Sequence, residues 1–140
     1  SSAASDVYKR QGSLKLKEVS YIHSESYAAG ELKHGTISLI DEDVPVIAVA
    51  TQTGIIPKTI SNVVEVKSRG AKVILVCTDA CARELKDGVA DYVIEIPHTD
   101  ELLMPITAVV PLQILAYYTS INRGIDPDKP KNLAKSVTVE

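Results

Sequence analysis

The chain has 140 residues, 45% of them apolar, which is the size and composition of one ordinary globular domain. Its 15 Lys and Arg residues against 18 Asp and Glu residues give a formal net charge of -3, so no excess of basic charge is present for binding nucleic acid or an anionic membrane. The two cysteines, Cys77 and Cys81, are too few for a disulfide framework or a metal site, and we expect free thiols in a cytoplasmic protein.

The first part of the chain divides into a polar leader, a helix and a loop. Residues 1–11 (SSAASDVYKRQ) contain no apolar stretch long enough for a secretory signal and share no periodicity with the residues after them, so we expect a non-native or disordered leader. Over 14–29 apolar and small residues recur at steps of three and four, which predicts a helix with Lys15 and Glu18 on one face. The glycine-bounded segment 30–35 (GELKHG) is predicted to be an exposed loop.

Strands and helices alternate over the centre of the chain. Apolar runs at 44–50 (VPVIAVA), 72–77 (KVILVC) and 92–96 (YVIEI) predict strands, and the segments 57–68 and 80–86 predict helices between them. This alternation predicts an α/β fold, a three-layer αβα sandwich around a parallel sheet. Three strands are few for such a sheet, and no apolar run precedes the first helix, so we expect a domain truncated at its N-terminal strand.

The last predicted element is a long apolar helix over 104–123, bent if Pro111 lies inside it. The uncharged stretch 102–122 has the length of a membrane span, but its two prolines and its polar residues favour a buried helix of a soluble domain. The remaining segment 125–140 has two prolines and little periodicity, which predicts an irregular tail.

The titratable residues leave several chemical readings open. Asp79 follows a predicted strand, where open α/β sheets bind ligands, and it could be a phosphoacceptor or simply the cap of the next helix. Lys15 and Glu18 could be a catalytic pair or a solvated ion pair. His34 could be a ligand, a general acid or a loop residue, and His23 is expected to be half-buried.

Three long motifs resemble a known family. They are LKLKEVSYIHSESYAAGELKHG (14–35), IPHTDELLMPITAVVPLQILAYY (96–118) and PKNLAKSVTVE (130–140). Together they resemble the isomerase domain of the glutamine:fructose-6-phosphate aminotransferase family, and the resemblance extends over 12–140. It implies the sugar isomerase (SIS) fold, with 12–124 as part of the second of two such domains. The implied enzyme makes glucosamine 6-phosphate from fructose 6-phosphate, with ammonia released from glutamine in a separate domain.

The resemblance also implies roles for individual residues. Glu18 matches the family's catalytic glutamate, which moves a proton between C1 and C2 of the sugar. His34 matches a histidine that assists ring opening and reaches the site of the neighbouring subunit, which implies a homodimer. Lys135 matches the lysine that forms a Schiff base with the ketose carbonyl. Lys15 would orient the site electrostatically and Ala134 would contact the substrate through its backbone, while no cofactor is implied.

The sequence departs from the family pattern at three positions. Thr36 stands where Pro is usual, Lys131 stands where Arg is usual, and Gln11 stands where a glutamate is usual. Lys131 keeps the charge but loses the bidentate fork of Arg, and the mismatch at Gln11 fits a foreign leader.

Two parts of the implied enzyme lie outside this sequence. They are the loops that hold the sugar phosphate and the glutaminase nucleophile, so we expect the isolated chain to be inactive. The residues alone favour a solvated tail lysine at Lys135. The alternative function is a noncatalytic module that binds sugar phosphates and uses the same fold for regulation, although such a module would need neither Lys135 nor Glu18.

Overall fold

The computed structural model describes residues 2–131. In chain order its helices and strands are α1 (Ser2–Ser20), β1 (Pro45–Ala50), α2 (Ile56–Ser68), β2 (Lys72–Thr78), α3 (Asp79–Glu84), β3 (Tyr92–Ile96) and α4 (Met104–Asn122). Three short 3-10 turns are η1 (Glu31–Lys33), η2 (Thr36–Leu39) and η3 (Thr53–Ile55).

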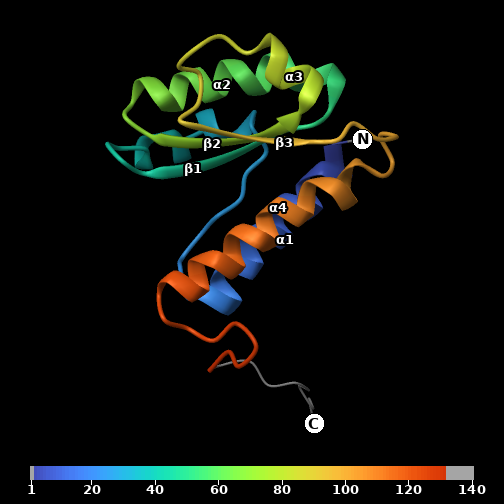
Figure 1. The fold of residues 1–140 in the computed structure, drawn as a ribbon. Helices are drawn as coiled ribbons and strands as arrows, with labels where there is room; N and C mark the ends of the chain where they lie inside the picture. The colour runs from blue at the N-terminus through green and yellow to red at the C-terminus, as the bar shows by residue number, and fades with distance from the viewer. Residues whose placement is uncertain (1, 132–140) are drawn as a thin grey trace.

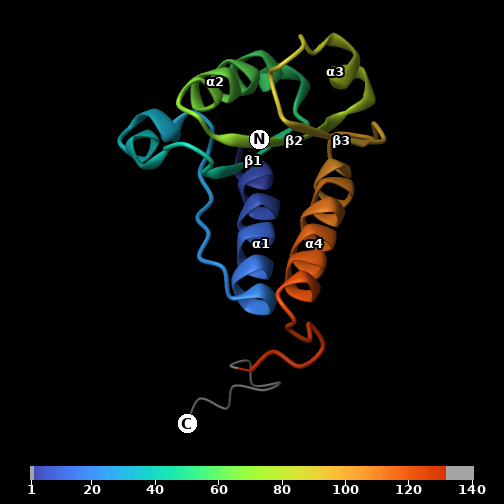
Figure 2. The same ribbon diagram turned by 60° about the vertical axis from the view of Figure 1, so that its left-hand side comes forward.

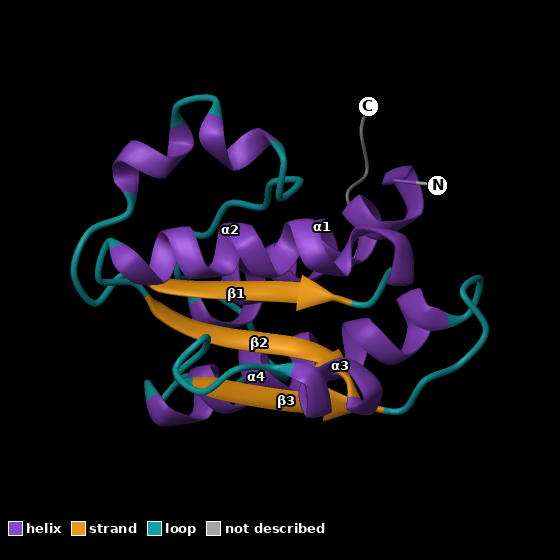
Figure 3. Ribbon diagram, turned by 90° about the horizontal axis from the view of Figure 1, so that it is seen from above, coloured by secondary structure: helices purple, strands orange, loops and turns teal. Residues whose placement is uncertain are grey.

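The three strands form one parallel sheet in the order β1-β2-β3. Helices α2 and α3 cover one face of this sheet, and α1 and α4 lie on the other side (Figure 1, and from above in Figure 3). The predicted α/β fold with a parallel sheet between helices is therefore confirmed.

The central strand explains why both faces of the sheet are covered. Successive side chains of a strand point to opposite faces, and all of β2 from Val73 onward is apolar until Thr78. Leu75 and Cys77 join the core beneath α2 and α3, whereas Val76 joins the core that contains residues of α1 and α4. A continuous apolar run thus buries both faces at once.

Helices α1 and α4 pack against each other along a seam of small residues. Ala108, Ala116 and Ser120 of α4 are buried, and a Cβ atom added at Gly12 of α1 would lie 2.7 Å from Leu112 Cδ1. Small side chains at the seam allow the two backbones to approach closely. Figure 2 shows the pair extending away from the sheet, so that its far end is held by helix–helix contacts rather than by the strands.

The first helix differs from its prediction at both ends. Residues 2–11 are helical rather than disordered, and Tyr8 is buried with its hydroxyl 2.9 Å from Thr51 Oγ1. The helix stops at Ser20 instead of continuing to residue 29, because Tyr21 adopts a positive φ of 55° and the following segment is extended. Whether residues 1–11 are foreign to the protein stays a prediction.

The other elements lie within two residues of their predicted bounds. The expected exposed loop at 30–35 contains the short turn η1, and Pro111 lies inside α4. Residues 125–131 form neither helix nor strand, as predicted for the start of the tail. The rest of the tail lies outside the described residues.

Candidate functional site

The last turns of α1 bring Lys15 and Glu18 together. Lys15 Nζ donates to Glu18 Oε2 over 2.6 Å, as the i,i+3 spacing on a helix allows. The side chain of Glu18 is only 22% exposed and that of Lys15 is 40% exposed. The pair is thus partly covered yet reachable, and the ammonium fixes the orientation of a carboxylate that can accept and return a proton.

His34 lies in a different part of the molecule, between η1 and η2. Its backbone N–H donates to Glu31 O over 3.0 Å, and Gly35 follows with a φ of 128°, which turns the chain sharply. Lys33 ties this turn to α2 through a 2.7 Å ion pair with Glu65, and the hydrogen bond from Lys33 lowers the pKa of that carboxyl. The turn is therefore anchored while the imidazole of His34 stays exposed.

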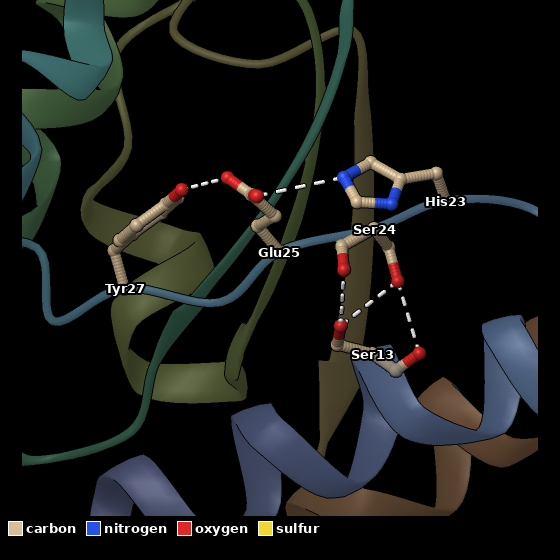
Figure 4. A network of polar contacts seen from close by, with 5 residues as sticks. All are labelled: Ser13, His23, Ser24, Glu25 and Tyr27. Atoms are coloured by element: carbon tan, nitrogen blue, oxygen red, sulfur yellow. Dashed lines mark hydrogen bonds and ion pairs between the residues drawn. The ribbon is translucent and has the colours of Figure 1, made fainter.

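An extended segment, residues 21–28, connects the end of α1 to the turns that flank His34. Figure 4 shows how this segment is attached to α1. Ser24 Oγ donates to Ser13 O over 2.9 Å, and Ser13 Oγ lies 2.9 Å from Ser24 O and 2.8 Å from Ser24 Oγ. We call this pair of residues the serine clamp. It fixes the path along which the chain returns from the end of α1 towards the sheet.

A chain of polar contacts follows the same segment. His23 Nε2 lies 3.5 Å from Glu25 Oε1, and the Tyr27 hydroxyl donates to the other oxygen of Glu25 (Figure 4). The prediction of a half-buried His23 is wrong, because its side chain is 83% exposed on an extended segment rather than on a helix. His23, Glu25 and Tyr27 are spaced two residues apart, as on one side of an extended segment. This spacing is the sequence signal that could have predicted an extended segment with an exposed His23.

The structure does not bring all the predicted site residues together. Within residues 7–131 no hydrogen bond or ion pair joins the side chain of His34 to Lys15 or Glu18. Figure 2 shows why, since the end of α1 lies at the far end of the helix pair, whereas η1 and η2 lie beside the sheet. Lys135 and Ala134 lie outside the described residues.

The residues at the carboxyl end of β2 are held in structural contacts. Thr78, not Asp79, caps α3, because its Oγ1 accepts from Cys81 N over 3.4 Å. Asp79 is instead hydrogen-bonded to Arg83 on the surface, which argues against a phosphoacceptor. Cys77 and Cys81 are free and buried, and burial raises the pKa of Cys77 to about 12, which makes it a poor nucleophile.

No group of three or more metal-ligating side chains occurs in the part of the chain that the structure describes. One helix, Met104–Asn122, is long and apolar enough to cross a membrane by length and composition alone.

Comparison with known proteins decides the family. The family model described as SIS domain matches residues 10–123. The chain belongs to the SIS domain family. The predicted resemblance is thereby confirmed, and the sheet and helices described above are those of a SIS domain.

Relatives of this SIS domain share one name. The glutamine--fructose-6-phosphate aminotransferase [isomerizing] of Clostridium perfringens is 57% identical over 130 residues, which cover 93% of this chain and 21% of the relative. The protein of the same name from Thermococcus kodakarensis is 52% identical over 130 residues, again 93% of this chain and 21% of the relative. This chain thus spans about a fifth of the length of the curated relatives it matches.

Solved structures agree with this assignment. The C-terminal domain of glucosamine-fructose-6-phosphate aminotransferase from Francisella tularensis has a TM-score of 0.78 and 40% identity, and covers 83% of this chain and 32% of that chain. A glucosamine-6-phosphate deaminase from Thermotoga maritima has a TM-score of 0.72 and 28% identity, and covers 94% of this chain and 37% of that chain.

Proposed function

We propose that this SIS domain is the C-terminal part of the isomerase region of a cytoplasmic glutamine:fructose-6-phosphate aminotransferase. Its substrate would be fructose 6-phosphate and its product glucosamine 6-phosphate. The observation that carries this proposal is the 57% identity over 93% of the chain with a relative of that name. The whole enzyme would need the other four fifths of its length, so the isolated chain would be inactive.

The proposed chemistry assigns one step to each residue. His34 assists opening of the sugar ring by moving a proton to or from the ring oxygen. The amine of Lys135 then adds to the C2 carbonyl and water leaves, which gives an iminium that withdraws electrons from C1. Ammonia released from glutamine adds to C2 of this iminium and the amine of Lys135 leaves, so the nitrogen from ammonia stays on C2. Glu18 takes a proton from C1 and delivers it to C2, and loss of the hydroxyl proton at C1 leaves the aldehyde of the product, with Lys15 orienting the carboxylate and the backbone of Ala134 contacting the sugar.

Two features of the described residues support these roles. The carboxylate of Glu18 is held 2.6 Å from Lys15 Nζ while remaining partly exposed, which is what a positioned base requires. Within the described part of the chain the imidazole of His34 is exposed and has no side-chain partner, so it is free to reach another subunit. We therefore include a homodimer in the proposal.

Borohydride trapping tests whether Lys135 forms an imine with fructose 6-phosphate. The test protein is the Clostridium perfringens aminotransferase with its matching segment replaced by residues 12–140 of this chain, which supplies the remaining domains. With fructose 6-phosphate, borohydride should add the mass of one reduced sugar to the hybrid enzyme. Lys135→Ala should abolish the adduct, and Lys129→Ala, a nearby lysine, should leave it intact. An undiminished adduct in Lys135→Ala would show that another amine forms the imine.

A solvent-exchange experiment tests the proton transfer separately. In deuterated water the hybrid enzyme should exchange a C1 proton of fructose 6-phosphate, and Glu18→Gln should lose this exchange by about 10²- to 10⁴-fold while the adduct still forms. Exchange that continues unchanged in Glu18→Gln would remove Glu18 from its assigned role.

A noncatalytic module that binds sugar phosphates is the second candidate. It is favoured by the separation of Glu18 from His34 within one copy of the chain. Binding of fructose 6-phosphate to the hybrid enzyme with neither adduct nor exchange would support this candidate over the enzyme.

A further inference from the structure

Tyr21, the first residue after α1, has an unusual backbone conformation. Its φ is 55°, in the left-handed region that a bulky aromatic residue rarely adopts and that glycine or asparagine adopts with less strain. Contacts on both sides hold it there, since the buried Ser20 donates to Leu16 O over 2.6 Å and Ser24 belongs to the serine clamp. A strained residue fixed by its neighbours points to a role for its side chain.

The side chain of Tyr21 reaches the opposite end of the described chain. Its phenol oxygen accepts a hydrogen bond from the backbone N–H of Lys131 over 2.5 Å, between residues 110 positions apart. Pro130 has no N–H, so Lys131 offers the first backbone donor after it. A phenylalanine ring could occupy the same place but could not accept this hydrogen bond. We call the hydrogen bond between Tyr21 and Lys131 the tail tether.

The segment that follows α4 is attached to the helix pair at two places. At the first, Ile125 N–H donates to Ser120 O over 3.0 Å, and the Ser120 hydroxyl lies 3.0 Å from Ile125 O. Residues 126–129 then form a turn whose hydrogen bonds stay within the segment. The tail tether is the second attachment, and within the described residues it is the last hydrogen bond from the tail to the rest of the molecule. Figures 1 and 2 show this segment beyond the ends of α1 and α4.

The tail tether lies between two residues of the proposed reaction. Glu18 precedes Tyr21 by three residues, in the last turn of α1. Lys135 follows Lys131 by four residues, which span at most about 14 Å, so the tether limits how far the backbone of Lys135 can lie from the end of α1. Without the tether the last attachment is Ile125, ten residues before Lys135, and the limit rises to about 35 Å.

We infer that Tyr21 is a positioning residue of the proposed enzyme, because its phenol oxygen holds the tail beside the end of α1 and so keeps the amine of Lys135 close to the sugar on which Glu18 acts. The inference rests on the proposed function, in which Lys135 is the reacting amine. Tyr21 acts through the backbone of the tail and transfers no proton. The donor is a backbone N–H, so the tether does not depend on which of lysine and arginine stands at residue 131.

The length of the untethered segment sets the size of the effect. The effective concentration of a group on a flexible segment falls about as the 3/2 power of the length of that segment. Ten residues in place of four therefore lower the effective concentration of the Lys135 amine about fourfold. The tether does not contact the sugar, so the half-saturating concentration of fructose 6-phosphate should not change.

Rates of borohydride trapping in the hybrid enzyme test the inference, with Tyr21→Phe compared against Tyr27→Phe. Both changes remove one phenol oxygen from segment 21–28 and keep the ring, but the Tyr27 hydroxyl donates to Glu25 within that segment. At saturating fructose 6-phosphate Tyr21→Phe should slow adduct formation about fourfold, and Tyr27→Phe should match the unchanged hybrid. A purely structural role of Tyr21 would lower Tm and leave this rate alone. Equal rates in the two variants, or a change confined to the half-saturating concentration, would overturn the inference.

Amide hydrogen exchange tests the tether independently of the chemistry. In the chain of 140 residues, NMR should show faster exchange of the Lys131 amide in Tyr21→Phe than in the unchanged chain, because that amide loses its acceptor. The Ile125 amide, which donates to Ser120 O, should exchange at the same rate in both and serves as the control. An unchanged rate at Lys131 would show that the phenol does not hold the tail, and would overturn the inference.

A change on the other side of the contact tests whether one hydrogen bond is responsible. Lys131→Pro removes the donor, so it should slow adduct formation as Tyr21→Phe does. The double variant should be no slower than the slower single variant, because both changes remove the same hydrogen bond. Effects that multiply in the double variant would show that the two residues act separately, which would contradict the tether.

Failure of the inference is distinguishable from failure of the proposed function. An unchanged hybrid enzyme that forms no adduct would reject the proposed function, and the role of Tyr21 with it. An unchanged hybrid enzyme that forms the adduct, with Tyr21→Phe equally fast, would leave the proposed function standing and reject Tyr21 as a positioning residue.

Discussion

Replacing Ser120 with alanine should loosen the far end of the helix pair that carries Glu18. Ser120 is fully buried, and its hydroxyl lies 2.8 Å from Val19 O and 3.0 Å from Ile125 O. A hydroxyl has one proton to donate, and Val19 is next to Glu18 in the last turn of α1, where helix carbonyls lack partners within the helix. Ser120→Ala removes that donor from a carbonyl in a part-buried contact between the two helices.

The cost can be worked out from this geometry. Leaving a buried carbonyl without its hydrogen bond costs about 1–3 kcal/mol, and the higher helix propensity of alanine offsets about 0.5 kcal/mol of it. For a chain of this length 1 kcal/mol lowers Tm by about 3 °C, so we expect a loss of about 2–8 °C.

Ser68→Ala is the matched control. Ser68 is also in the last turn of a helix, and its hydroxyl donates to Glu65 O over 2.7 Å, but this hydrogen bond is exposed and water can replace it. Circular dichroism gives the Tm of both variants. Because each variant loses a serine hydroxyl that donates to a helix carbonyl, the difference between their shifts in Tm measures the effect of burial. Equal shifts in Tm would refute the argument that the buried position of the Ser120 hydroxyl determines its contribution.

Three other changes have defined outcomes in unfolding experiments. Gly70→Ala should destabilise the chain more than Gly88→Ala, by about 1–3 kcal/mol in urea unfolding, because both glycines have positive φ but only at Gly70 would a Cβ meet backbone, at 2.9 Å. Burial raises the pKa of Cys77 to about 12, so the contribution of this thiol to the free energy of unfolding is complete below about pH 8.5. Above that pH the thiol of the unfolded chain ionises, and stability should fall by at most about 1.4 kcal/mol per pH unit. Cys77→Ala should flatten this alkaline slope. The hydrogen bond from Lys67 lowers the pKa of Asp91, so the contribution of this carboxylate to stability is present above about pH 4 and is lost as the pH falls through the lowered pKa. Asp91→Asn should therefore flatten the acid side of the stability–pH curve.

The fold could be predicted where local pattern and tertiary structure agree. The run KVILVC is apolar at every position after its lysine because both faces of β2 are covered, so its strand and its central place can be read from sequence. Pro57 near the start of α2 and Gly70 after its end marked that helix within one or two residues. These signals are local in sequence, and the elements that they predict are present in the structure.

The first helix shows where local pattern is insufficient. Its apolar spacing continues past Ser20, but the serine clamp between Ser13 and Ser24 folds the chain back, and Tyr21 turns it with a positive φ. The burial of Tyr8 against Thr51 depends on a residue 43 positions away, which no periodicity within residues 1–11 could indicate. Pairing of Lys15 with Glu18 was predictable from spacing, whereas the distance of His34 from both depends on how the whole chain folds.

That distance has a consequence for the proposed enzyme. Glu18 is near the end of α1 that points away from the sheet, and the turn that carries His34 is attached to α2 by Lys33, so one copy does not join them (Figure 2). If both act on one sugar, they must come from different subunits. The hybrid enzyme with Glu18→Gln and the hybrid enzyme with His34→Ala should then each be inactive, and a mixture exchanged through monomers should recover about a quarter of the activity, because half of the dimers are mixed and each has one complete site. Activity that stays absent after verified exchange of subunits would place both residues in the same copy and would require the rest of the enzyme to rearrange the segment between them.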